Sequence, residues 1–509
     1  MTKITIILMT VLATMVNIRT VTAGIFTMAL MSDSSKEAIV RMDGTDSITI
    51  DWGDGTAKKK YSFPTDYRIL GGFDYRHTYS KDSAYTITIT GNNITLLDCC
   101  CLNIVYLDIS KNTKLIELYC SNNKITDLDI SKNTALTHLD CGYNQLTSLD
   151  VSNNTALTGL TCVSNQLTGL ELSINTTLKT LACSSNPLKS LDVSRNTELT
   201  SLICEDNQLT SLDVSRNTAL VFFYCGHNQL TSLDVSRNLE ITYLGCNVNQ
   251  LSNLDISRNV ALENLNLSNN QFTSFSASGA AELKVLSCGY NLLTSLDISG
   301  NNALKQLMCE HNQLLELDVS NNIELYELRC YNNQFTSLDV FRNNKLTTLN
   351  GNFNQLKRLD LSKNTALKFL FFENNQLAAL DLCNNIELIY LHIGLNQLTC
   401  IDISQNIALK ELTCSQNKLS YLDLRANALL ENLNCPENQL TTIDMGGASA
   451  LKKVFCPENQ LSTETINTLF EMLPHNTNPE NLLDICISNN PGAYTCTPKI
   501  ATDKGWIVR

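Results

Sequence analysis

The amino-acid sequence predicts a β-rich solenoid in which parallel strands stack, with one coil of chain for every 21 residues. An asparagine recurs at this interval from Asn123 to Asn459 without insertion or deletion. An apolar residue lies five positions before each of these asparagines, and another lies two positions after it. A fixed period of roughly 20–50 residues is typical of stacked units that bury their apolar faces against one another.

Each repeat has two related halves. The period that begins at Leu136 reads LTHLDCGYNQL and then TSLDVSNNTA. Apolar residues alternate at Leu139 and Cys141, and again at Leu149 and Val151, so each pair faces one side of an extended segment. We expect the recurring asparagine to occupy a tight turn and its amide to hydrogen-bond the backbone of the bend, bridging successive coils.

These motifs resemble the leucine-rich-repeat family in its short bacterial form, which has two related halves per repeat. The resemblance covers roughly residues 97 to 461, and we assign the solenoid to residues 96–461. It implies a leucine-rich-repeat solenoid that binds a protein partner, on a host or a neighbouring cell, without catalysing a reaction.

The first 23 residues have the features of a secretory signal peptide. Lys3 precedes an apolar stretch that ends near Val16, and small residues lead to a predicted cut ahead of Gly24. The apolar stretch is too short to span a membrane. We therefore expect a protein that is secreted, or held at the cell surface or in the periplasm. Its net charge of −13 argues against nucleic acid as a partner and against insertion into anionic membranes.

Residues 24–95 lack the repeat and alternate as strands around residues 47–52 and 85–90. Together with the WGDGT turn that starts at Trp52 and the HTY motif at His77, these strands resemble a β-sandwich module of the polycystic-kidney-disease (PKD-like) type. We expect the module to cap the open edge of the first coil. His77 is expected to be a structural residue of the sandwich.

Residues 462–509 form a predicted short α/β C-terminal cap. Residues 462–474 combine a helix start signal, helical apolar spacing and a final proline, Pro474. A strand is predicted over residues 482–487 and another near Trp506.

The chain has 20 cysteines, of which 14 share one position of the repeat. Leu267, Phe372 and Ile393 fill the same position elsewhere, which marks it as an apolar interior position. We expect buried free thiols that pack as small hydrophobes. Metal ligation is the alternative, but it lacks the usual clustering with histidine or paired cysteines, so no metal or cofactor is predicted. Cys486 and Cys496, outside the column, are the better candidates for a disulfide.

An acidic residue recurs in the second half of the repeat, at Asp129, Asp150, Glu171 and onward to Asp444. Stacked like charges repel one another. We expect the repulsion to be offset by a partly basic column three residues later and by flanking Ser and Thr hydroxyls. Calcium is the alternative, although the glycine-rich repeat of calcium-binding β-rolls is absent.

The positions that flank the first-half strand vary from coil to coil, which is where a repeat protein places recognition. Aromatic residues gather there, and they are typical anchors of protein contacts. The alternative is that they are isolated surface residues or are partly buried. The candidate binding residues are a first group of Phe369, Phe371, Tyr390 and His392, a second group of Phe222, Tyr224, His227 and Tyr243, and Arg329 and Tyr331 between the groups.

The function that follows is recognition of a protein partner through these variable columns. A carbohydrate-binding surface protein and a purely structural surface spacer are the alternatives. No glycine-rich phosphate loop, nucleophile elbow or paired-histidine motif occurs in the sequence, so an enzyme is not expected.

Overall fold

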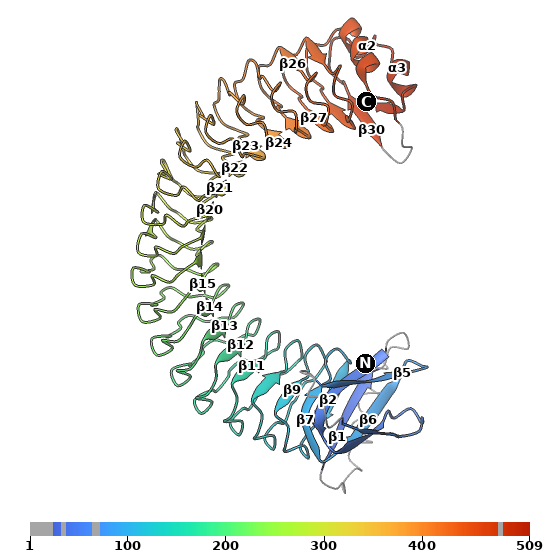
Figure 1. Ribbon diagram of the computed structural model, residues 1–509, viewed down its shortest axis with the longest axis vertical. Coiled ribbons are helices and arrows are strands. Elements are labelled where there is room, and N and C mark those ends of the chain that lie inside the picture. The colour runs from blue at the N-terminus through green and yellow to red at the C-terminus, as the bar shows by residue number, and fades with distance from the viewer. Residues whose placement is uncertain (1–23, 32–36, 64–71, 477–481) are drawn as a thin grey trace. The chain divides into compact units, whose positions relative to one another are not determined.

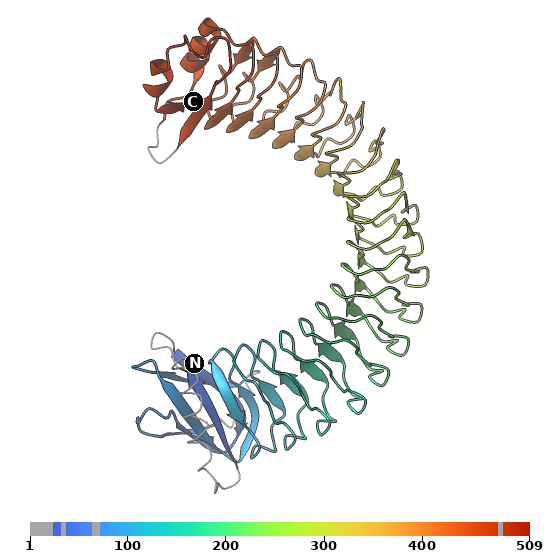
Figure 2. The ribbon, with the colours of Figure 1, turned by 180° about the vertical axis from the view of Figure 1, so that it is seen from behind.

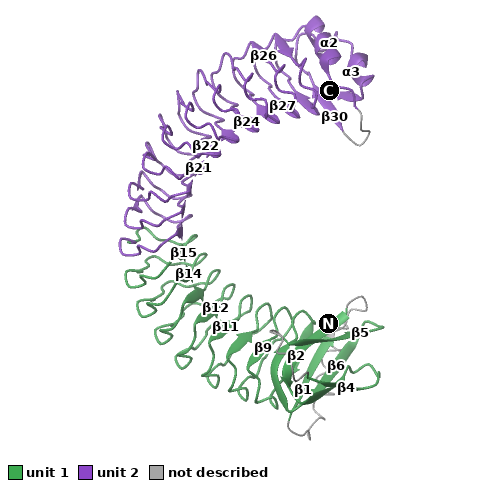
Figure 3. Ribbon diagram, in the orientation of Figure 1, with its two compact units in different colours: residues 1–255 green, residues 256–509 purple. Residues whose placement is uncertain are grey.

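The computed structural model describes residues 24–31, 37–63, 72–476 and 482–509 (Figure 1). The predicted signal peptide lies outside this part of the chain. Seen from both sides (Figures 1 and 2), short strands lie along one face of the stacked coils. None of the helices in the described residues is long and apolar enough to cross a membrane. The chain forms two compact units, residues 1–255 and 256–509 (Figure 3), and each is described by itself.

The first unit begins with a module of two sheets. The five-stranded sheet has the order β4-β3-β6-β1-β8, and every neighbouring pair in it is antiparallel. In the second sheet β2 pairs antiparallel with both β5 and β7. The core includes Met28, Ile50, Trp52 and Ile89, all almost fully buried. The strands are β1 (Ile25–Met31), β2 (Glu37–Thr45), β3 (Ser47–Asp51), β4 (Lys59–Ser62), β5 (Phe73–Thr78), β6 (Ala84–Thr90), β7 (Asn93–Asp98) and β8 (Ile104–Asp108).

His77 packs inside this module. Its ring stacks on Trp52, with centroids 4.9 Å apart, and its Nε2 lies 2.7 Å from Oδ2 of Asp54. Both groups are mostly shielded from solvent. These contacts support the structural role expected for His77.

The N-terminal module and the first coil of the solenoid have two strands in common, β7 and β8. β7 pairs with β2 on one side and, in parallel, with the first solenoid strand β9 (Glu117–Tyr119) on the other. β8 completes the five-stranded sheet by pairing with β1. The first coil therefore gives one strand to each sheet of the module and leaves its own edge covered. The boundary predicted after residue 95 falls within β7.

The remaining coils of the first unit stack in a fixed register of 21 residues. Leu139 pairs with Leu160, and Leu160 with Leu181, in a parallel ladder. The second half of each coil forms turns in this unit. The strands that follow β9 are β10 (His138–Asp140), β11 (Gly159–Thr161), β12 (Thr180–Ala182), β13 (Ser201–Ile203), β14 (Phe222–Tyr224) and β15 (Tyr243–Gly245).

The second unit is built from the same 21-residue coil. Its second halves form two short parallel pairs, β17 (Ser274–Ser276) with β19 (Ser295–Asp297), and β26 (Tyr421–Asp423) with β28 (Thr442–Asp444). Within each unit the first-half strands line the inner face of the coils (Figure 1). These strands are β16 (Asn264–Asn266), β18 (Val285–Ser287), β20 (Gln306–Met308), β21 (Glu327–Arg329), β22 (Thr348–Asn350), β23 (Phe369–Phe371), β24 (Tyr390–His392), β25 (Glu411–Thr413), β27 (Asn432–Asn434) and β29 (Lys453–Phe455).

The C-terminal cap confirms the predicted helix and strands. Helix α2 (Thr463–Met472) starts at Ser462, whose Oγ accepts a hydrogen bond of 3.1 Å from the backbone N–H of Thr465. β30 (Leu483–Cys486) and β31 (Trp506–Val508) extend the parallel ladder beyond β29. The short helix α3 (Lys499–Thr502) was not predicted.

The asparagine column bridges successive coils, as predicted. The Oδ1 of Asn354 accepts a 3.0 Å hydrogen bond from the N–H of Phe335 in the preceding coil. Its Nδ2 donates to the carbonyl oxygens of Cys330 in that coil and of Gly351 and Asn352 in its own. One buried amide thus satisfies four backbone groups that water cannot reach.

A second asparagine column stabilises the other half of the repeat. No role was predicted for it from the sequence. The Nδ2 of Asn154 donates to the carbonyl oxygens of Ile130 and Asn133, at 3.1 and 2.9 Å. This column is interrupted at Ala280, which is buried in the same position.

The column cysteines are buried and free, as predicted. Burial raises the pKa of the Cys330 thiol to about 12 and shifts that of Cys141 in the same direction. The Sγ of Cys141 lies 3.6 Å from the carbonyl oxygen of Thr161 in the next coil. Cys486 and Cys496, the better candidates for a disulfide, are both free, and each thiol contacts an oxygen within three residues.

Candidate partner-binding face

The strand face of each unit carries the variable side chains. In β23 the side chains of Phe369 and Phe371 flank Leu370, which is completely buried. This alternation is the two-residue period of a strand. The flanking positions are therefore at least partly open to solvent in most coils, although Gly159, Gly245 and Thr413 are buried.

The structure brings the four residues of the Phe369 group together. Phe369 stacks on Tyr390, with ring centroids 5.4 Å apart and an interplanar angle of 24°. Phe371 meets His392 edge to face at 5.0 Å. The Nε2 of His392 lies 2.9 Å from Oε1 of Glu411 in the following coil, which fixes the imidazole. All four side chains are half-buried. The result is a preformed aromatic surface.

The second group in the first unit is only partly assembled. Phe222 stacks on Tyr243 at 5.1 Å, and Phe222 is 42% exposed. The ring of Tyr224 lies over Gly245, where an added Cβ would come within 2.7 Å of it. Burial raises the pKa of the Tyr224 hydroxyl, as do the nearby Tyr243 and Glu205.

His227 lies outside this ring stack, contrary to the sequence grouping. It occupies the turn after β14 with a φ of +52°, and its Nδ1 is 3.6 Å from Oδ1 of Asp206. The repeat shows which column a residue occupies, but the turn directs this column away from the strand face.

Arg329 and Tyr331 make separate contacts, and Tyr331 belongs to a ring cluster that was not predicted. The guanidinium of Arg329 is paired with Glu327, with Nε and Oε1 2.6 Å apart. Tyr331 meets His311 edge to face at 5.2 Å, and His311 stacks on Tyr290 at 4.1 Å. Tyr290 and His311 each immediately precede an asparagine of the recurring column. This shared position in adjacent coils could have predicted that their rings stack.

The position before each asparagine has a left-handed backbone. Its φ lies near +50° to +57° from Asn122 to Glu458. Asparagine, aspartate or serine occupies it in many coils. Asn and Asp are enriched in the left-handed conformation. Large apolar residues also occur there and are exposed, including Tyr143 at 60% and Phe353 at 44%.

The core beneath the Phe369 group differs from that of other coils. The cysteine column is replaced by Gly351, Phe372 and Ile393 in three successive coils. Phe372 is completely buried, and an added Cβ on Gly351 would come within 2.7 Å of its ring. The group therefore coincides with a distinct interior.

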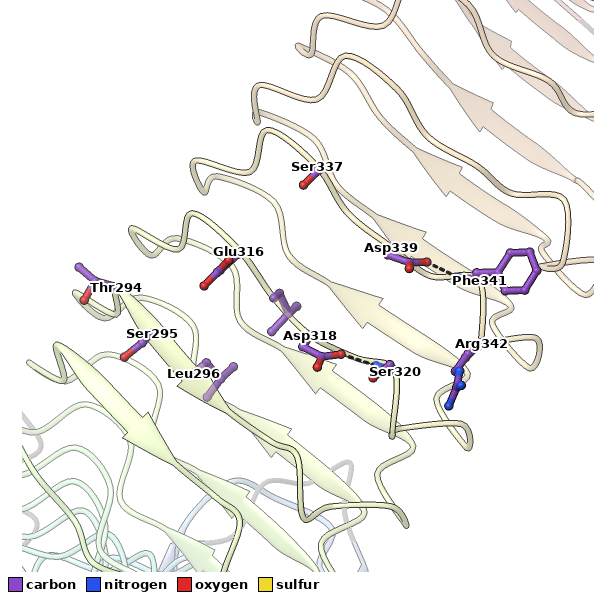
Figure 4. Close-up of a pocket in the computed structure, with 11 residues that line it drawn as sticks. Thr294, Ser295, Leu296, Glu316, Asp318, Ser320, Ser337, Asp339, Phe341 and Arg342 are labelled. Carbon is purple, nitrogen blue, oxygen red and sulfur yellow. Dashed lines mark hydrogen bonds between the residues drawn. The ribbon is translucent and has the colours of Figure 1, made fainter.

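The opposite half of the repeat carries the acidic column and shallow pockets. Figure 4 shows one pocket in the second unit, lined by residues that include Glu316, Asp318, Asp339, Phe341 and Arg342. The carboxylates of Asp318 and Asp339 each accept a 2.9 Å hydrogen bond from the backbone N–H two residues later (Figure 4). They therefore act as turn-forming residues.

Those local hydrogen bonds stabilise the acidic column. The hydroxyl and N–H of Ser320 hold the pKa of Asp318 below its usual value, and Arg342 contributes less. Asp150 has a lowered pKa from Ser152 with no basic contribution. The predicted hydroxyl contribution is confirmed, whereas the basic column matters less than predicted.

No three His, Cys, Asp or Glu side chains within the described residues are placed to hold a metal ion. The carboxylates of the acidic column point into separate turns instead of converging on one point. The geometry is that of a surface with fixed side chains.

Comparison with known proteins agrees with this architecture. A family model described as leucine-rich repeats in two copies matches residues 113–154. The functional domain of InlJ from Listeria monocytogenes, which includes a cysteine ladder, is 33% identical over 73% of this chain and 78% of that chain, with a TM-score of 0.57. The chain belongs to the leucine-rich-repeat family.

Other leucine-rich-repeat structures show the same fold at lower identity. YopM from Yersinia enterocolitica is 23% identical over 78% of this chain and 87% of its own, with a TM-score of 0.60. The ectodomain of the Arabidopsis receptor kinase HAESA, solved with a peptide hormone ligand, is 20% identical over 78% and 79%, with a TM-score of 0.62. No curated protein matches the chain.

Proposed function

We propose that this leucine-rich-repeat protein is a non-catalytic recognition protein that binds a protein partner through the strand face of its solenoid. We place its site of action outside the cytoplasm, after removal of residues 1–23. The PKD-like module at residues 24–95 and the cap at residues 462–509 would close the two ends of the repeat array at residues 96–461.

The observation that carries the proposal is the Phe369 group. Four aromatic side chains on two adjacent strands pack against one another and remain partly open to solvent. Preformed aromatic anchors bind at a low entropic cost because few rotamers have to be fixed. The HAESA ectodomain, which has the same fold, was solved in complex with a peptide hormone ligand, and this supports a protein or peptide partner.

Sugar binding is less well supported by the same geometry. Stacking a sugar requires a free ring face, and Phe369 and Tyr390 turn one face toward each other. The half-buried rings still offer apolar surface, which suits apolar side chains of a protein partner.

The proposal is tested by an array of extracellular proteins and a glycan array, both probed with the mature protein and with the double variant Phe369→Ala/Tyr390→Ala. The matched control is Phe341→Ala/Tyr421→Ala, which removes two aromatic residues, 47% and 45% exposed, from the other half of the repeat. We expect a protein hit that weakens about 30-fold in the first variant, the loss of a hot spot worth about 2 kcal/mol. The control should bind normally.

Loss of a glycan hit in place of a protein hit would overturn the proposal in favour of carbohydrate binding. A protein hit that weakens equally in the control variant would also overturn it, because binding would then not depend on the strand face.

A further inference from the structure

A lysine column runs beside the strand face of the second unit. It occupies the position immediately before each first-half strand. In the first unit this position holds mainly Thr and apolar residues, with Lys179 as its one lysine from residue 116 to residue 242. In the second unit five of its ten positions are lysine, Lys284, Lys305, Lys368, Lys410 and Lys452, and two are glutamate, Glu263 and Glu431.

Two lysines of this column flank the Phe369 group and have no charged partner. Lys284 and Lys452 are paired with Glu263 and Glu431 of the preceding coils, at 2.8 and 2.6 Å. Lys368 and Lys410 are exposed, and neither side chain has an ion pair or hydrogen bond to any residue that the structure describes.

The carboxylates beside the group are mostly engaged. Glu411 contacts His392, and Glu327 pairs with Arg329. Lys368 directly precedes β23, whereas Glu373 lies in the turn beyond the other end of the strand. Two more carboxylates lie nearby: Glu387 is exposed two residues before Ile389, and Glu431, which follows Lys410 in the column, is paired with Lys452. Lys368 and Lys410, which form the lysine edge of the group, are thus two positive charges left unpaired among the described residues, in a protein whose net charge is −13.

The spacing of the two lysines fits an extended chain. Lys368 and Lys410 are two coils apart, or about 10 Å at the usual distance between strands. Three residues of a chain in the polyproline II conformation cover about 9 Å at about 3.1 Å each, and its three residues per turn place side chains three apart on the same side. Ile389 occupies the intervening coil in the same column, so the edge reads positive, apolar, positive.

We propose that the Phe369 group and its lysine edge bind an acidic peptide segment of the partner in the extended polyproline II conformation, which runs along the sheet and across the strands. Two acidic side chains three residues apart meet Lys368 and Lys410, and an apolar side chain packs on the rims of Phe369 and Tyr390. This inference rests on the proposed function and adds the chemistry of the partner.

A displayed library of random 12-residue peptides, selected on the immobilised full-length protein, tests the proposal. We expect selected peptides to be enriched in Asp or Glu at a spacing of three residues, with an apolar residue between them. The variant Lys368→Glu/Lys410→Glu should lose this enrichment and weaken the best peptide at least tenfold. The matched control Lys357→Glu/Arg358→Glu makes the same change of charge at exposed sites in the other half of the repeat, and should bind normally.

Selection of neutral or basic peptides by the unmodified protein would overturn the inference. So would a selected acidic peptide that binds the Lys368→Glu/Lys410→Glu variant undiminished, or binding of a sulfated glycan alone. If Phe369→Ala/Tyr390→Ala abolishes capture of a protein partner while the lysine reversal does not, the proposed function stands and this inference fails.

Discussion

The ring of Phe372 fills the space in which a side chain on Gly351 would lie. A Cβ on Gly351 would be 2.7 Å from Cζ of Phe372, closer than van der Waals contact allows. Both residues occupy the interior position that holds cysteine in most coils. Adjacent coils have thus exchanged volume, one losing a side chain and the next gaining a ring, so that the interior stays close-packed.

This exchange predicts coupled effects on stability. Gly351→Cys should cost about 1–3 kcal/mol by overpacking, and Phe372→Cys about 3 kcal/mol by leaving a cavity. The double variant restores the cysteine column and should be more stable than either single variant. Urea unfolding followed by circular dichroism measures all three, and strictly additive losses would contradict the volume exchange.

Removing one asparagine of the first column should be costly because its amide satisfies backbone groups in two coils. Asn354→Ala leaves the N–H of Phe335 and three carbonyl oxygens without that partner. At about 1–3 kcal/mol for a buried group left unsatisfied, we expect a loss of at least 2 kcal/mol in urea unfolding. The exposed neighbour Gln355→Ala is the control and should change stability by less than about 0.5 kcal/mol.

Large residues at the left-handed turn position should be replaceable with a gain in stability. Tyr143 has a φ of +52° and is 60% exposed, so its side chain has little packing to lose. Asparagine tolerates this conformation better. We expect Tyr143→Asn to raise stability by about 0.5–1 kcal/mol, and the converse change Asn374→Val to lower it by about 1 kcal/mol. A lower unfolding midpoint for Tyr143→Asn would show that its ring is held by contacts worth more than the strain.

Acid should destabilise the repeat through the acidic column. The pKa values of Asp129 and Asp318 are lowered in the folded state by the hydroxyl and N–H of the serine two residues later. A folded-state pKa below the unfolded value gives stability that is present above the unfolded pKa, about 3.9 for Asp. That stability is lost as the pH falls through the folded-state value. We expect the urea midpoint to hold from pH 7 to about pH 5 and then to fall, less steeply when both residues are changed to Asn.

Thiol labelling should separate buried from exposed cysteines. The column thiols are buried, and burial raises the pKa of those at Cys141 and Cys330, so iodoacetamide at pH 8 should modify the column only after unfolding. Cys101, Cys383 and Cys400 are exposed and should react in the folded protein. Asp381 raises the pKa of the Cys383 thiol, so Cys383 should react more slowly than Cys400. Asp381→Asn should remove that difference, as mass spectrometry of labelled peptides would show.

The regular part of the fold could be predicted because each interior column repeats one physical requirement many times. Leu139, Cys141 and Asn144 occupy the positions expected from their spacing. The site was harder to predict from the sequence. A repeat shows which column a residue occupies, but not the direction in which its side chain points from a turn. His227 illustrates this, and so does the contact between His392 and Glu411, which joins different columns of adjacent coils.

The way β7 and β8 are shared has a consequence for engineering. Since one coil contributes to both layers of the N-terminal module, a cut after residue 95 would sever β7 and separate β8 from β1. A fragment that ends beyond residue 108 keeps both of these strands. Anyone transplanting this front end onto a different repeat array should carry the opening coil with it.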